Sequence, residues 1–130
     1  MIFIDTSVWV QFFRGKDSVL IQELRLLLDR DVAALSVVSW LELLSGVRAQ
    51  EKPRLSRVLS ALPRYFPKEK TWLRVESWIE EGVRKGQRFS ATDLMIASIA
   101  VDQEGLIWSL DSDYARMENL GFIRRYRVGG

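Results

Sequence analysis

Short apolar runs alternate with longer amphipathic segments along almost the whole chain, and this alternation limits the folds that the chain can adopt. Residues 1–5, 32–35 and 106–110 have the length and composition of buried strands. Between them, apolar residues recur at helical spacing, as in Leu20 and Leu24. Strands that alternate with helices are typical of a parallel sheet covered on both faces. We therefore predict an α/β fold with three α/β/α layers and a central, mostly parallel sheet of four or five short strands.

Turn and capping residues divide the chain into the expected elements. Gly15 follows the first helical segment as a stop, Asp17 precedes the second as a cap, and Pro53 suits the first turn of another helix. The expected strands cover residues 1–5, 32–35, 64–67, 106–110 and 122–126. The expected helices cover residues 6–14, 18–30, 36–47, 53–62, 70–85, 90–104 and 113–119. Because the chain has 130 residues and no repeat or linker, residues 1–130 are expected to form a single domain.

The chain contains no histidine and no cysteine, which excludes several kinds of active site. Ser-His-Asp triads, paired-histidine ribonuclease chemistry, the zinc-protease helix motif and cysteine-based zinc sites are all ruled out. Carboxylate, hydroxyl, lysine and arginine side chains remain for catalysis. No apolar stretch is long enough to span a bilayer, and residues 1–10 lack the features of a signal peptide, so we expect a cytoplasmic protein with no membrane contact.

Acidic residues stand in apolar surroundings at points where such a fold brings distant segments together. Asp5 and Asp111 each follow a predicted strand, while Glu42 and Asp93 interrupt apolar helical stretches. Parallel sheets bind ligands at the carboxyl ends of their strands, so Asp5 and Asp111 would face each other if their strands are neighbours. Buried carboxylates are costly without a cation, and oxygen ligands favour Mg²⁺ or Mn²⁺ over zinc. The acids therefore indicate a divalent metal site.

Helix capping explains the same acids in another way, and the sequence leaves this interpretation open. The segments 39–42 and 90–93 both match the capping box, in which a hydroxyl and a later carboxylate satisfy free backbone N–H groups. Asp5 and Asp111 could each cap the helix that follows. Capping does not account for the apolar residues around the acids of the two boxes, because a cap works equally well at an exposed helix end.

A series of short motifs runs along the chain. The motifs are Asp5-Thr6-Ser7 after the opening strand, Ser39-Trp40-Leu41-Glu42-Leu43, Ala91-Thr92-Asp93-Leu94-Met95-Ile96-Ala97, and Trp108-Ser109-Leu110-Asp111-Ser112-Asp113-Tyr114. In order and spacing, over essentially the whole chain, they resemble the PIN-domain nucleases. The length and the short connections are most similar to the VapC type of toxin from toxin-antitoxin pairs. Ser109 stands where threonine is commoner in the family, and it keeps the hydroxyl.

This resemblance implies a PIN-like fold and a metal-dependent endoribonuclease, the toxin of a toxin-antitoxin system, which hydrolyses RNA phosphodiesters with Mg²⁺ or Mn²⁺. The implied catalytic and metal-binding residues are Asp5, Glu42, Asp93 and Asp111. The implied supporting residues are Thr6, Ser7, Ser109 and Asp113. The resemblance also implies a homodimer held by helices, and a cognate antitoxin that places a basic side chain in the acidic pocket.

Basic residues concentrate in the middle of the chain, although the formal net charge is only +2. Residues 48–74 contain eight basic and two acidic side chains, whereas residues 75–123 contain four basic and nine acidic ones. An acidic centre beside a basic flank suits an enzyme that acts on nucleic acid. We expect Arg48, Arg54 and Arg57 to contact RNA, unless this tract is only a solvated helix face.

Two other functions compete with this interpretation. A phosphotransferase of another Asp-based α/β family also opens with a strand that ends in aspartate, but the haloacid-dehalogenase type needs a second aspartate where this chain has Ser7. A receiver-type protein needs a lysine after its last strand, and this chain has arginines there. The second alternative is a non-catalytic regulatory or interaction module, because a fold does not prove an activity.

The first helical segment carries three aromatic residues on one face, Trp9, Phe12 and Phe13. Large apolar side chains of this kind usually lie in a protein core. An exposed aromatic cluster would instead serve as a surface for a second copy or an antitoxin. The sequence does not decide between a core and an interface role.

Overall fold

The computed structural model describes residues 1–129, which form a parallel sheet between layers of helices. The strands lie in the order β3-β2-β1-β4, and every neighbouring pair is parallel. Their bounds are β1 Ile2–Ile4, β2 Ala33–Ser36, β3 Arg64–Tyr65 and β4 Leu106–Trp108. The predicted α/β class and parallel sheet are confirmed. The predicted domain, 1–130, includes Gly130, which lies outside the described residues.

The helices begin and end close to the predicted positions. They are α1 Thr6–Arg14, α2 Ser18–Asp29, α3 Val37–Gly46, α4 Lys52–Leu59, α5 Glu69–Arg84, α6 Ala91–Asp102 and α7 Ser112–Asn119, with a 3₁₀ turn at Ala49–Glu51. Gly15 ends α1 in the left-handed region at φ 73°, a conformation that favours glycine. Asp17 caps α2 by accepting a hydrogen bond from the backbone N–H of Leu20.

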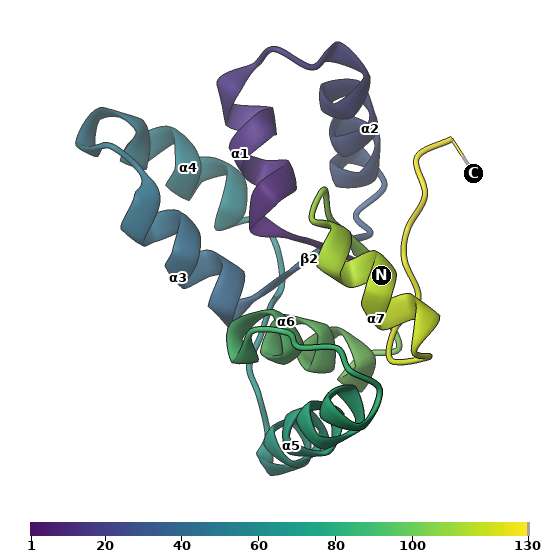
Figure 1. Cartoon of the computed structure of the whole chain (residues 1–130). Coiled ribbons are helices and arrows are strands. Elements are labelled where there is room, and N and C mark those ends of the chain that lie inside the picture. The colour runs from purple at the N-terminus through teal and green to yellow at the C-terminus, as the bar shows by residue number, and fades with distance from the viewer. Residues whose placement is uncertain (130) are drawn as a thin grey trace.

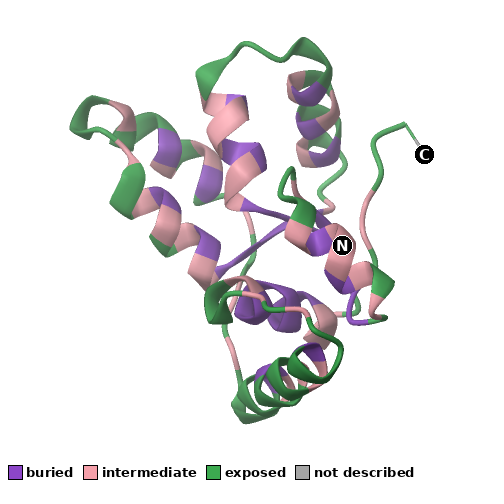
Figure 2. Cartoon of the chain, in the orientation of Figure 1, coloured by how far each residue is buried: buried purple, intermediate pink, exposed green. Residues whose placement is uncertain are grey.

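Alternate residues of each strand point to opposite sides, and this divides the core into two halves. Ile2, Ile4 and Leu35 pack in one half with α1, α2 and α4, whereas Phe3 and Ile107 pack in the other with α5, α6 and α7. Figure 1 shows the helices of the two halves on opposite sides of the strands. In Figure 2, α6 is buried along most of its length, while α5 buries only one side. Helix α6 therefore lies between α5 and the sheet.

The central strand β1 has β2 on one side and β4 on the other, so the strand order reverses at β1. Ile4 pairs with Trp108, and the backbone N–H of Asp5 donates to the carbonyl oxygen of Trp108 over 2.9 Å. The carboxyl ends of β1 and β4 therefore lie side by side. Ligands of open α/β sheets bind at such a reversal, and Asp5 and Asp111 follow these two strands.

The predicted strand at residues 122–126 is wrong. Only a single bridge joins Ile107 to Arg125, flanked by hydrogen bonds from Ile107 N to Arg124 O and from Tyr126 N to Ile107 O. The backbone N–H of Arg125 instead donates to Oε2 of Glu118 over 2.8 Å. Because Ile107 bonds to the flanking residues Arg124 and Tyr126, this N–H points away from β4. A side chain of α7 therefore satisfies the outer side of the segment, and the pairing with β4 stops after one bridge.

The aromatic residues of α1 belong mainly to the core. Trp9 is fully buried and Phe12 is 6% exposed, whereas Phe13 is half-buried. The Trp9 ring lies edge-on to Phe12 and stacks with Phe13, with centroid distances of 5.8 Å and 6.0 Å. Trp9 and Phe12 therefore have the core role and not the interface role, while Phe13 lies at the edge of the core.

Gly105 joins α6 to β4 at a point where the chain has no room for a side chain. A Cβ atom at this position would lie 2.8 Å from the ring of Phe3, which is itself buried. We expect Gly105→Ala to lower the free energy of unfolding by about 1–3 kcal/mol, because overpacking forces the ring to move. Urea denaturation measures the change. The control is Gly46→Ala at the end of α3, where nothing lies within 4 Å and no loss is expected.

Glu118 on α7 holds the C-terminal segment by ion pairs with Arg125 and Arg127. The Arg127 hydrogen bond and the bonds from Arg125 lower the pKa of Glu118 to about 2. A carboxylate with a lowered pKa in the folded state stabilises that state above its unfolded pKa, and the contribution is lost as pH falls toward the folded pKa. Glu118→Gln should therefore lower the melting temperature at pH 7. The difference from wild type should shrink between pH 4.5 and pH 2, and a difference that is constant with pH would contradict the ion-pair explanation.

Candidate active site

Asp5 and Asp111 are helix caps that also lie at the reversal of the strand order. Asp5 precedes α1 and accepts from the backbone N–H of Ser7, and Asp111 precedes α7 and accepts from that of Asp113. The capping interpretation is thus correct for both residues. It does not compete with a site, because strands that lead directly into helices place their caps at the carboxyl edge of the sheet.

Hydroxyl groups fix the carboxylate of Asp5, which is only 6% exposed. Its Oδ2 accepts from Oγ of Ser7 over 2.8 Å and from Oγ of Ser109 over 2.7 Å. Ser7 Oγ also accepts from the backbone N–H of Leu110, and Ser109 Oγ accepts from that of Asp111. Within residues 1–129, no hydrogen bond reaches the other oxygen, Oδ1. The serines thus orient Asp5 and leave one of its oxygens free.

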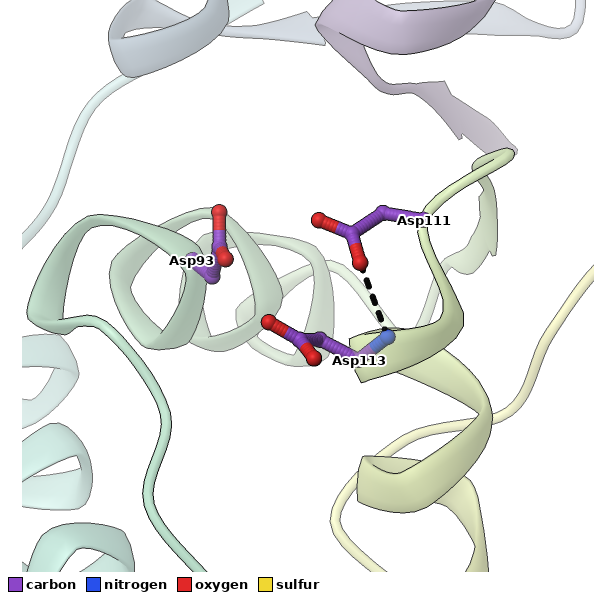
Figure 3. Close-up of side chains that lie close together, drawn as sticks. All are labelled: Asp93, Asp111 and Asp113. Atoms are coloured by element: carbon purple, nitrogen blue, oxygen red, sulfur yellow. Dashed lines mark hydrogen bonds between the residues drawn. The ribbon is translucent and has the colours of Figure 1, made fainter.

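Asp93, Asp111 and Asp113 form a compact acidic group, in which one carboxylate oxygen of each lies within 4.8 Å of the others. Figure 3 shows the three carboxylates turned toward a common space, with Asp93 on α6 and the other two at the start of α7. Burial raises the pKa of Asp93, and the negative charges of Asp111, Asp5 and Asp113 raise it further. Within residues 1–129 the hydrogen bond with Ser90 lowers the pKa of Asp93 and no cationic side chain does, so an added positive ion would favour the charged form of this acid.

The capping box predicted for residues 39–42 is wrong. The cap of α3 is Ser36, whose Oγ accepts from the backbone N–H of Ser39, so Glu42 lies inside the helix. Its Oε1 instead accepts from the hydroxyl of Thr6 on α1 over 2.7 Å. The box at residues 90–93 is half correct, since Ser90 caps α6 and accepts from the backbone N–H of Asp93. Glu42 therefore has no capping role and is held toward α1.

Tyr114 links the predicted acids, although the sequence analysis gave it no role. Its ring is fully buried, and its hydroxyl donates to the backbone carbonyl of Asp93 over 3.4 Å. Burial raises the pKa of this phenol, and the charges that raise it further come from Asp5, Asp93, Glu42 and Asp111. All four acids thus lie near one phenol. The residues around Tyr114 in the sequence are mostly polar or charged, so the sequence signals neither its burial nor the charges that surround it.

Arg116 is a second residue that the sequence analysis missed. It pairs with Asp113 over 2.7 Å and donates to Gln87 and to the backbone carbonyl of Arg88, while its guanidinium lies 4.5 Å from the centre of the Phe89 ring. Asp113 therefore has a positive partner, unlike Asp93. The spacing of Asp113 and Arg116, three positions apart on a helix, is the signal that could have revealed the pair.

The predicted RNA-binding arginines lie in different surroundings. Arg48 and Arg54 line a groove of about 540 Å³ between α1 and the segment from α3 to α4, and Thr6 and Glu42 stand at one end of it. Arg57 is exposed on α4 and does not line the groove. The structure therefore places two of the three arginines in the same groove as Glu42.

The donor groups of this site suit a hard divalent ion. They are carboxylate and hydroxyl oxygens, which Mg²⁺ and Mn²⁺ prefer, and the chain has no histidine or cysteine to favour a softer metal. Asp5, Glu42 and Asp111 each accept a hydrogen bond at one oxygen, and the bonds among residues 1–129 leave the second oxygen free. This pattern orients a carboxylate without saturating it.

The chain is similar to known proteins over almost its whole length. The sequence model of the PIN domain matches residues 2–120. The chain belongs to the PIN-domain family. It is 30% identical to ribonuclease VapC11 of Mycobacterium tuberculosis over 128 residues, which cover 92% of this chain and 96% of the relative. The resemblance drawn from the sequence motifs is therefore confirmed.

Solved structures of the same fold include VapBC2 from Rickettsia felis bound to a promoter DNA fragment, with a TM-score of 0.80 and 20% identity over 97% of this chain and 98% of that one. A toxin-antitoxin complex from Klebsiella pneumoniae has a TM-score of 0.73 and 15% identity over 95% of both chains. These likenesses confirm the PIN-like three-layer fold. Among the helices of residues 1–129, none is both long and apolar enough to cross a membrane.

Proposed function

We propose that this PIN-domain protein is a metal-dependent endoribonuclease and the toxin of a toxin-antitoxin pair, acting on RNA in the cytoplasm. The observation that carries the proposal is the acidic group of Asp93, Asp111 and Asp113 beside the free oxygen of Asp5, at the reversal of the strand order. The family match and the similarity to VapC11, which is named a ribonuclease, support the same activity. A phosphotransferase and a non-catalytic module are the competing functions.

In this proposal Asp5, Asp93 and Asp111 are the direct ligands of Mg²⁺ or Mn²⁺. A bound ion of this kind supplies a more acidic water and a positive charge near the phosphoryl oxygens. Glu42, whose carboxylate is hydrogen-bonded to Thr6, would accept a proton from the attacking water or bind the ion through a water molecule. Ser7 and Ser109 fix the rotamer of Asp5 through its Oδ2. Asp113, which is paired with Arg116, lies beside Asp111 and is a supporting residue.

A cleavage assay separates the three functions. Purified protein is incubated with total cellular RNA in Mn²⁺, in Mg²⁺ and in chelator, and the new 5′ ends are mapped by sequencing. We expect cleavage at a small set of sites with either ion and none in chelator. A non-catalytic module would give no new ends under any condition, and a phosphotransferase would modify RNA or protein without breaking the RNA chain.

The proposed partners are a cognate antitoxin and a second copy of the chain. The antitoxin is supported by the structural neighbour described as a toxin-antitoxin complex. A stable complex should co-purify when the chain is expressed from its native operon. If the neighbouring genes encode no such protein and none co-purifies, the toxin assignment fails while the nuclease assignment is still testable by the cleavage assay.

The exposed apolar face of α5 supports the homodimer. Trp72, Ile79 and Val83 are 59%, 43% and 52% exposed and recur at helical spacing. Contiguous apolar surface of this kind usually marks an interaction site. We expect the wild type to be a dimer in multi-angle light scattering and Trp72→Lys to shift it to monomer. Val19→Lys, which changes a single exposed residue of α2, is the matched control and should leave the mass unchanged.

A further inference from the structure

The groove between α1 and the segment from α3 to α4 is lined by apolar, acidic and basic side chains. Its apolar lining comes from Val10 of α1, Leu43 of α3, Val47 after α3 and Leu55 of α4. Thr6, which directly follows Asp5, lines the inner end with Glu42, and the two side chains are hydrogen-bonded. The outer rim carries positive side chains from both walls: Arg14 and Lys16 near the end of α1, and Arg48 and Arg54 opposite. A ligand in this groove therefore meets cations at one end and the acids at the other.

We infer that this groove binds the unpaired nucleotides next to the phosphodiester that is cut, with phosphates on the basic rim and a base stacked on the guanidinium plane of Arg54, which the Phe13 ring supports. The inference rests on the proposed ribonuclease function and adds where the substrate strand lies. It also separates Arg54, which lines the groove, from the exposed residues of the basic tract that do not.

Charge complementarity is the first argument for RNA. Arg48 is paired with Glu51 over 2.6 Å, but within residues 1–129 no ion pair is formed by Arg14, Lys16 or Arg54. Unpaired cations on a groove wall attract phosphates, and such contacts give affinity without selecting a base sequence. The rim thus has positive charge available for a strand that runs toward the acids.

The half-buried ring of Phe13 is the second argument. It lines the groove, and the guanidinium of Arg54 lies 5.2 Å from its centre while donating to the Phe13 carbonyl oxygen. Because Trp9 and Arg54 both lie over this ring, the arginine plane and not the ring is the surface offered to a base. Arginine planes are usual stacking partners of unpaired bases. The groove volume of about 540 Å³ also suits a nucleotide, since sites for ligands of that size measure about 300–1,000 Å³.

Binding measured in chelator tests the groove independently of cleavage. A short fluorescent single-stranded oligoribonucleotide is titrated with wild type, Arg54→Gln and Phe13→Leu, and the titration is repeated over a range of salt concentrations. Arg54→Gln should weaken binding and reduce the log–log salt slope by about 0.7 for a lost phosphate contact. Phe13→Leu should weaken binding roughly 5- to 100-fold with an unchanged slope, because stacking involves no counterions. Thermal melts check that Phe13→Leu, which keeps an apolar side chain, is folded.

The matched control is Arg25→Gln, which removes an exposed arginine of α2 far from the groove lining. It should bind the oligonucleotide as wild type does. Equal binding by Arg54→Gln and Arg25→Gln would overturn the inference, and so would equal affinity for a fully paired duplex. If Arg54→Gln keeps RNA binding but releases a co-purifying protein, the groove is a protein-docking surface instead. Failure of the wild type to cleave RNA in Mn²⁺ overturns the proposed function, which the binding series does not measure.

Discussion

Replacing Asp93 by asparagine is expected to abolish RNA cleavage while making the metal-free protein more stable. Asp93 is half-buried, and burial together with Asp111, Asp5 and Asp113 raises its pKa. Two like charges about 4 Å apart repel by up to roughly 4 kcal/mol at an effective dielectric constant of 20. A carboxylate in the first turn of a helix stabilises that helix by only about 0.3–1 kcal/mol. Even a fraction of the repulsion therefore exceeds the helix contribution, and the melting temperature in chelator should rise.

The loss of cleavage by Asp93→Asn should be on the order of 100-fold or more, because even changes to groups that merely support a metal ligand cost 10- to 100-fold. The control is Glu69→Gln, which removes an exposed carboxylate from the first turn of α5. It tests the helix contribution alone and should lower the melting temperature slightly. Melting in chelator and cleavage in Mn²⁺ are measured for both variants. If Asp93→Asn melts lower, as Glu69→Gln should, and still cleaves, Asp93 serves its helix and not a metal.

The positions of Asp5 and Asp111 could be predicted from sequence because one local rule fixes both of their roles. Each follows a short apolar strand and precedes a helix, so each caps that helix at the carboxyl edge of the sheet. Capping and a site are alternatives in the sequence, whereas in the structure the caps themselves lie at the edge of the sheet where the site is proposed. Asp113 was assigned only a supporting position, yet the distances place its carboxylate in the group with Asp93 and Asp111. Such distances depend on how α6 and α7 approach each other, which no local pattern contains.

The errors in the predicted elements also arise because tertiary contacts are not contained in the local sequence. Residues 122–126 have the composition of a strand, but their pairing with β4 stops at the single bridge of Arg125 with Ile107. Residues 39–42 match a capping box, but Ser36 caps α3 earlier and Glu42 bonds to Thr6 of another helix. In the first case most of the pairing with a distant strand is missing. In the second a bond to a distant helix takes the place of the local cap, and no local pattern reveals either outcome. The length and type of most elements were predictable because buried strands and amphipathic helices follow from hydrophobic periodicity alone.

The groove distinguishes the residues of the basic tract at 48–74 that line a binding surface from those that do not, which the charge count alone does not do. A count of residues 48–74 does not separate a solvated face from an RNA contact, since both consist of exposed arginines and lysines. The structure separates them by position, because Arg54 lines a groove together with Glu42, while Arg57 is exposed and does not line it. The acids would hold the ion and the reacting phosphate, and the groove would hold the nucleotides beside it. Loss of a groove residue should therefore raise KM more than it lowers kcat.

Added Mn²⁺ is expected to stabilise the wild type and to have a much smaller effect on Asp5→Asn. An ion that binds only the folded state stabilises it by about 2.7 kcal/mol at a hundred times its Kd. Asparagine caps helices as well as aspartate does, and its carbonyl oxygen can accept from Ser7 and Ser109 as Oδ2 does now. The variant should therefore keep α1 and melt at or above the wild type in chelator, because it loses a negative charge near Asp93.

Melting over a Mn²⁺ titration measures this difference, and Asp17→Asn is the matched control. Asp17 is also a helix cap that accepts from a backbone N–H, but it is exposed at the start of α2 and absent from the acidic group. Its replacement should leave the Mn²⁺ response and the cleavage rate unchanged. If Asp5→Asn and Asp17→Asn respond to Mn²⁺ alike, Asp5 is a cap only, and the ion that supports cleavage must be held without it.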